Sequence, residues 1–176
     1  MRFFFFGLLA DSDMLELVIG RPAPGRPFPR ARLAGFRLAR LRGESFPVLA
    51  PAPGSRVEGV VVGGLSAADV DRILFFESVE YEPAPVAVEL LDGGIVEAQA
   101  FTASARGDAA DEEWRFEDWL ARHKARDLRE TALWMTLYGR LDVAAADRLW
   151  DRARAEGRPL EDLIREIRRA PLRTGS

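Results

Sequence analysis

The first hundred residues alternate short apolar runs with glycine- and proline-rich segments, a pattern typical of strands joined by turns. A continuous aromatic run opens the chain, and a later segment alternates arginine with apolar side chains, which favours a half-buried strand. The last two apolar runs flank Asp92-Gly93-Gly94, which predicts a β-hairpin. The predicted strands are residues 2–6, 31–41, 57–62, 85–91 and 95–103.

Two helices interrupt these strands. Residues 12–19 carry apolar side chains at helical spacing, and Gly20 predicts the end of that helix. Ser66 and Asp69 form a capping-box pattern that predicts a second helix to about Phe75. The proline-rich segments are predicted to be irregular loops, over residues 21–29 and 47–55. The resulting order, β-α-β-β-α-β-β, predicts a mixed sheet in the α+β class.

From Asp108 onward glycine and proline are rare, and apolar residues recur at three- and four-residue spacing, which predicts amphipathic helices. Two of these helices are expected over residues 142–156 and 159–169. We therefore expect a sheet domain at residues 1–105 and a helical extension at 108–172. Because the tryptophan- and leucine-rich faces of the extension cannot stay exposed, it should pack on the sheet domain or form a homo-oligomer contact.

Composition excludes several classes of site. The chain has 176 residues, no cysteine and a single histidine, so disulfides, thiolate metal sites and multi-histidine metal centres are ruled out. We expect neither a metal nor a cofactor, and we interpret His123 as a surface or packing residue. The net charge of −3 argues against a nucleic-acid partner, because a protein that binds by neutralising phosphates normally carries an excess of basic residues. Catalysis, if present, must use carboxylates, hydroxyls or backbone amides.

The N-terminal apolar run superficially resembles a signal peptide. It is short, Asp11 and Asp13 follow it at once, and no small-residue cleavage site appears. A buried first strand is the better interpretation, so a cytoplasmic protein without a membrane partner is expected.

Seven short motifs follow one another in the first part of the chain. Each is weak evidence singly, whereas their order and spacing are informative together. In chain order they are Phe6-Gly7-Leu8-Leu9, Val18-Ile19-Gly20-Arg21, Leu33-Ala34-Gly35-Phe36-Arg37, Phe46-Pro47, Val57-Glu58-Gly59-Val60-Val61-Val62, Gly64-Leu65-Ser66, and Phe76-Glu77-Ser78-Val79-Glu80-Tyr81.

This succession resembles the gamma-glutamylcyclotransferase-like family, including its AIG2-like branch, over about residues 2–104. The resemblance implies a small, mixed, barrel-like sheet with packed helices. It also implies a metal-independent transferase or lyase that cyclises a gamma-glutamyl amine or peptide to 5-oxoproline and releases an amine or amino acid. The partner would be this small-molecule substrate.

Carried over residue by residue, the resemblance assigns two parts of a site. Glu77 would be the catalytic acid/base, in a motif that reads Phe-Glu-Gly-x-x-Tyr in the family. The turn after the first strand would hold the substrate through backbone groups. The substrate-binding residues would be Phe6, Gly7, Leu8, Leu9 and Tyr81.

The residues suit that chemistry. The α-amine of the substrate attacks its own γ-carbonyl, so the protein needs a base and backbone donors rather than a nucleophile. Apolar neighbours and the negative end of a helix should raise the pKa of Glu77, which makes it a better base. Gly7 lacks a β-carbon and so lets the backbone approach a ligand.

Five positions depart from the family pattern. Phe6 replaces a tyrosine, Leu8 a hydroxyl residue and Ser78 a glycine, and the changes at Leu74 and Pro83 replace an aspartate and an arginine. These departures leave open an alternative, a catalytically retired binding or interaction module on the same fold.

Other residues compete for the site. Glu80 and Glu82 are acids on the same segment as Glu77, although neither occupies the motif position. Tyr81 is interpreted as a cavity wall before a proton donor. Arg21 and Arg37 could hold a substrate carboxylate. The four tryptophans are interpreted as core anchors first and as ligand-stacking residues second.

Overall fold

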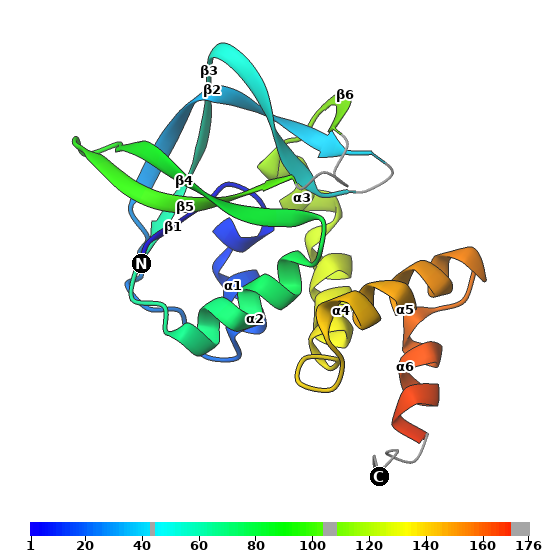
Figure 1. The fold of residues 1–176 in the computed structure, drawn as a ribbon. Coiled ribbons are helices and arrows are strands. Elements are labelled where there is room, and N and C mark those ends of the chain that lie inside the picture. The colour runs from blue at the N-terminus through cyan, green and yellow to red at the C-terminus, as the bar shows by residue number, and fades with distance from the viewer. Residues whose placement is uncertain (43–44, 104–108, 170–176) are drawn as a thin grey trace.

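The computed structural model describes residues 1–42, 45–103 and 109–169, and within them six strands form one sheet. The sheet order is β3-β1-β5-β4-β2-β6, and β2 also pairs with β3. This last pairing closes β1 to β5 into a barrel, with β6 added at the outer edge of β2 (Figure 1). The strands are β1 (Phe3–Phe5), β2 (Arg30–Leu41), β3 (Pro47–Val62), β4 (Tyr81–Leu90), β5 (Ile95–Ala103) and β6 (Ala109–Glu113).

Strand β1 is buried on both faces, as the aromatic run predicts. It pairs antiparallel with β3 and parallel with β5. Because successive side chains point to opposite faces of a strand, Phe3 and Phe5 join the cluster that contains the helices, whereas Phe4 and Phe6 join the cluster between the strands. Strand β1 therefore contributes side chains both to the barrel interior and to the packing of the helices.

The two predicted helices of the first half are confirmed. Helix α1 (Ser12–Ile19) begins at Asp11, whose carboxylate accepts hydrogen bonds from two amides of the first turn, and it ends at Gly20 with φ of 75°. Helix α2 (Ala67–Glu77) begins with the capping box of Ser66 and Asp69. A single 3-10 turn, η1 (Leu8–Ala10), links β1 to α1.

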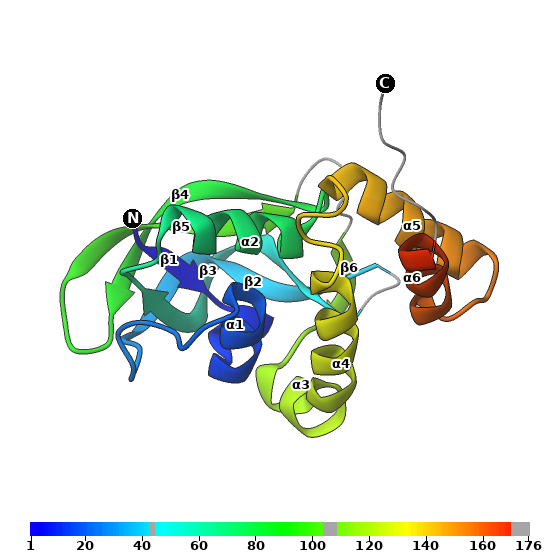
Figure 2. The same ribbon diagram turned by 90° about the horizontal axis from the view of Figure 1, so that it is seen from below.

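Four helices follow the sheet: α3 (Phe116–Arg122), α4 (Lys124–Met135), α5 (Val143–Ala155) and α6 (Leu160–Arg169). Helix α4 packs against α1 and α2, whereas α5 and α6 lie beyond it at one end of the molecule (Figure 2). Trp119, Trp134, Leu149 and Leu163 are buried in the same cluster as α1 and α2. The C-terminal helices thus pack on the sheet domain, the first of the two expected arrangements. No described helix combines the length and apolar character needed to cross a bilayer.

The prediction of a loop over residues 47–55 is wrong, because this segment is the first half of β3. The Phe46 carbonyl accepts a hydrogen bond from the amide of Leu41. In this antiparallel pair the backbone N–H and C=O groups of the even-numbered residues 46, 48 and 50 therefore point toward β2. Pro47 and Pro51 alternate with them, so their backbone nitrogens point away from β2. Proline lacks an amide but costs no ladder bond where its nitrogen points away from the partner strand. Strand β4 likewise begins at Tyr81, four residues before its predicted start, and includes Pro83.

The helices expected from Asp108 onward begin later in the chain than predicted. Residues 109–113 form β6, which pairs with Ala39 and Leu41 of β2. Alanine and glutamate favour helices locally, and the pairing with β2 overrides that preference. The expected boundary between residues 105 and 108 and the expected end at 172 fall outside the described residues.

Candidate active site

A cavity of about 310 Å³ lies at the rim of the barrel, in the lower part of the range of small-molecule sites. Most of its lining comes from four groups of residues: the end of β1 with its turn, the start of β3, the C-terminal end of α2 with the segment to β4, and one face each of α4 and α5. The members used below are Phe6, Gly7, Leu8, Leu9, Pro47, Glu77, Ser78, Glu80, Tyr81, Asp127, Glu130, Trp134, Asp147, Trp150, Asp151 and Arg154.

Gly7 brings bare backbone to this cavity. A β-carbon at Gly7 would lie 2.6 Å from Cγ of Pro47, so no other residue fits without displacing the start of β3. The first hydrogen bond of η1 runs from the Ala10 amide to the Gly7 carbonyl. The turn itself therefore leaves the amides of Gly7, Leu8 and Leu9 without an acceptor inside it.

Glu77 is the last residue of α2 and lines the same cavity. It is half-buried, and the surrounding protein withdraws its carboxyl group from bulk water. This burial raises the pKa of Glu77 from 4.5 to about 8, because the charged form is poorly solvated there. The carboxyl group can therefore exchange a proton near neutral pH.

Ser78, which follows Glu77, has a backbone conformation that favours glycine. Its φ of 62° and ψ of −158° lie in a region that side-chain-bearing residues adopt at a cost of about 1–3 kcal/mol. This conformation explains a glycine at the equivalent place of the family motif. In this chain the Ser78 hydroxyl donates a hydrogen bond to Oδ1 of Asp147 in α5.

All six residues predicted for the site line this one cavity: Phe6, Gly7, Leu8, Leu9, Glu77 and Tyr81. The Tyr81 hydroxyl donates a hydrogen bond of 3.1 Å to the carbonyl of Pro47, the residue packed against Gly7. Phe6, Leu8 and Leu9 are buried, so their side chains also belong to the core. The wall role of Tyr81 stays a prediction.

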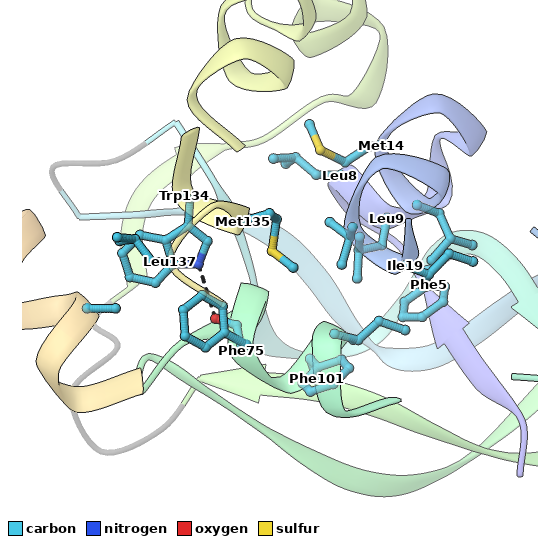
Figure 3. Packing of buried hydrophobic residues seen from close by; sticks show 14 of the residues in the cluster. Phe5, Leu8, Leu9, Met14, Ile19, Phe75, Phe101, Trp134, Met135 and Leu137 are labelled. Carbon is cyan, nitrogen blue, oxygen red and sulfur yellow. Dashed lines mark hydrogen bonds between the residues drawn. The ribbon is translucent and has the colours of Figure 1, made fainter. Parts of the chain in front are cut away.

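The α4 and α5 side of the cavity was not predicted. The indole of Trp134 donates a hydrogen bond of 3.2 Å to the Phe75 carbonyl in the last turn of α2 (Figure 3). Trp150 of α5 packs edge-on against Trp134, with ring centroids 6.0 Å apart. The tryptophans were predicted to be core residues, but nothing in their spacing indicates which other element they contact.

The competing residues fall in different places. Glu80 lines the cavity, whereas Glu82 is exposed on β4. The guanidinium of Arg21 is engaged with Asp69, with Nε 3.0 Å from Oδ1, and away from the cavity. Arg37 and His123 are not among the lining residues.

The five departures from the family pattern divide between the cavity and the surface. Phe6, Leu8 and Ser78 line the cavity, whereas Leu74 and Pro83 do not. Within the described ranges, no three acidic or histidine side chains are grouped so as to hold a metal ion.

Comparison with known proteins gives consistent relatives. AIG2-like protein D of Arabidopsis thaliana is 30% identical over 131 residues, which is 73% of this chain and 84% of that protein. AIG2-like protein A of the same plant is 28% identical over 126 residues, 70% of this chain and 74% of that protein.

Solved structures share the fold. One solution structure from Arabidopsis thaliana has a TM-score of 0.56 at 21% identity and covers 99% of this chain and 94% of its own, so the alignment includes the C-terminal helices. A structure titled gamma-glutamyl cyclotransferase has a TM-score of 0.50 at 16% identity, over 74% of this chain and 85% of its own. The family model described as "Gamma-glutamyl cyclotransferase, AIG2-like" matches residues 3–121, and the chain belongs to this family.

Proposed function

We propose that this protein is a gamma-glutamylcyclotransferase-type enzyme that converts a gamma-glutamyl amine or peptide into 5-oxoproline and a free amine or amino acid. The observation that carries the proposal is the position of Glu77. Its carboxyl group is shielded from water, has a raised pKa, and lines the same cavity as the Gly7 turn. Family membership supports the same reaction class.

The reaction needs one bond formed and one broken. The α-amino nitrogen of the substrate attacks the γ-carbonyl carbon, the five-membered ring closes, and the bond from that carbon to the leaving nitrogen breaks. Starting from the α-ammonium form, the attacking nitrogen loses two protons, one before the attack and one as the ring closes. The departing nitrogen takes one proton as its bond to carbon breaks and a second when the released amine becomes an ammonium, so no proton is gained or lost overall. Holding the two ends of one molecule in a bent conformation supplies much of the rate, because the attack is intramolecular.

Glu77 fits the proton transfers. A glutamate with its ordinary pKa of 4.5 would be a weak base toward an α-ammonium group, whose pKa is about 8. With its pKa raised to about 8, Glu77 can take the proton from that group and return it to the leaving nitrogen with little free-energy cost.

The turn amides would supply the second requirement. We assign the amides around Gly7 to Leu9 to the γ-carbonyl oxygen, which becomes negative as the tetrahedral intermediate forms. The apolar part of the wall, including Phe6 and Tyr81, would surround the glutamyl methylene groups.

The test uses the purified full-length chain with a panel of gamma-glutamyl alkylamines, gamma-glutamyl amino acids and gamma-glutamyl dipeptides. Released 5-oxoproline is measured by liquid chromatography and mass spectrometry. Glu77→Gln should lower the rate by about 10²–10⁴-fold, the usual contribution of a general acid–base group. Glu82→Gln, an exposed acid outside the cavity, is the matched control and should keep the wild-type rate.

Two results would overturn the proposal. The first is release of 5-oxoproline by Glu77→Gln as fast as by the wild type, which would remove Glu77 from the mechanism. Absence of release from every compound, with a folded protein, would instead favour the binding module that the departures at Phe6, Leu8 and Ser78 leave open.

A further inference from the structure

The end of helix α2 is attached to the C-terminal helices on both sides of Glu77. Two residues before it, the Phe75 carbonyl accepts the hydrogen bond from Trp134 of α4. One residue after it, the Ser78 hydroxyl donates to Asp147 of α5. The backbone that carries the proposed catalytic carboxyl group is therefore held by two helices that follow the sheet in sequence.

The second attachment depends on the hydroxyl group of Ser78, a residue whose backbone conformation disfavours any side chain. Glycine would adopt φ of 62° freely, but glycine has no hydroxyl group to reach Asp147. The chain thus combines an unfavourable conformation at Ser78 with a hydrogen bond that only a hydroxyl residue makes. Both partners line the cavity beside Glu77.

We propose that the Ser78–Asp147 hydrogen bond is a positioning contact, through which helix α5 fixes the exit of α2 and directs the Glu77 carboxyl group toward the Gly7 turn. This inference rests on the proposed function for its kinetic consequences. Ser78 and Asp147 would act through Glu77, so they are positioning residues and not catalytic residues.

The contact lies among other charged groups, which the experiment must separate from positioning. Besides Asp147, those that line the cavity with Glu77 are Glu80, Asp127, Glu130, Asp151 and Arg154. Removing the Asp147 carboxylate would change the local charge as well as the contact. Changes at Ser78 leave all of these charges in place and are the cleaner perturbation.

The experiment compares Ser78→Ala, Ser78→Gly, Asp147→Asn and Asp147→Ala, with the double variant Ser78→Ala/Asp147→Ala, all in the full-length chain. Ser78→Ala and Ser78→Gly should each lower kcat about tenfold with little change in KM, the scale of a hydrogen bond to a carboxyl group. Asp147→Asn keeps an acceptor oxygen and should lose less than Asp147→Ala. The double variant should lose no more than the larger single loss, because one contact is broken once.

Ser78→Gly is the decisive variant. It relieves the unfavourable conformation and leaves every charge in place, yet it should be slower because the hydrogen bond to Asp147 is lost. If it is as fast as the wild type, or if the losses in the double variant multiply, the positioning role is wrong.

A second measurement does not depend on turnover. The carboxyl carbon of Glu77, identified by its absence in Glu77→Gln, is titrated by ¹³C NMR in the wild type and in the two Ser78 variants. Without the contact, Glu77 should reach water more easily, and its titration should move toward 4.5. An unchanged titration overturns the inference, whereas a shifted titration with no turnover in any form upholds it and contradicts the proposed function instead.

Discussion

Replacing Glu77 by glutamine should stabilise the protein, and the gain should grow with pH. Glutamine has nearly the same shape as protonated glutamate and carries no charge at any pH. The folded wild type must keep Glu77 protonated or hold an ionised carboxyl group where water solvates it poorly. The variant avoids that cost.

The magnitude follows from the pKa of Glu77 in the two states, about 8 when folded and 4.5 when unfolded. Below pH 4.5 both states bind the proton and the wild type loses nothing. Between 4.5 and 8 the folded state holds more protons, so stability falls by about 1.4 kcal/mol for each pH unit. The wild type should therefore be less stable than Glu77→Gln by about 3 kcal/mol at pH 7 and by about 4 kcal/mol at pH 8.

Urea unfolding of both proteins at pH 5, 6, 7 and 8, followed by tryptophan fluorescence, measures this difference. Glu82→Gln is the control for the loss of a carboxyl group, since it removes an exposed one from the neighbouring strand, and it should not reproduce the gap seen with Glu77→Gln. A constant gap between wild type and Glu77→Gln across the four pH values would refute the assignment of a raised pKa to this residue.

Two further substitutions test the structure around Gly7 and at the start of α2. Gly7→Ala should lower the free energy of unfolding by about 1–3 kcal/mol and slow the release of 5-oxoproline, because its β-carbon would overlap Pro47. Gly63→Ala is the control in the same thermal melts, since its β-carbon would meet its nearest atom only at 3.8 Å. Asp69→Asn should cost about 2 kcal/mol at pH 7, since the hydrogen bond from Arg21 lowers the pKa of Asp69 from 3.8 to about 2. That stability is present above pH 3.8 and lost as the pH falls toward 2, so acid unfolding curves of wild type and variant should converge there, and curves that stay parallel would contradict it.

Local signals predicted most of the barrel strands and the two helices that accompany them. The aromatic run of β1, the capping box of Ser66 and the stop at Gly20 each specify their element through chemistry within a few residues. The proline-rich start of β3 was missed, because proline is tolerated there only through the orientation of each residue toward β2. That orientation depends on a partner strand and is invisible in the segment itself.

The site divides in the same way. Gly7 and Glu77 could be proposed as candidates because each sits in a short motif. The raised pKa of Glu77 was predicted from its apolar neighbours and helix end, and burial is what raises it. The wall made by Trp134, Asp147 and Trp150 could not be proposed, because these residues lie more than fifty positions from Glu77 and ordinary amphipathic helices carry them. Only the packing of α4 and α5 brings them to the cavity.

The central place of β1 has a consequence for how the chain acquires its structure. Phe3 to Phe5 are translated before their partners, which are Val60 to Val62 and Gln99. During synthesis this aromatic segment stays unpaired on one side until β3 has been translated and on the other until β5 has, and contacts between such distant positions form slowly. Premature association of nascent chains through these phenylalanines is therefore the hazard that the architecture builds into its own assembly.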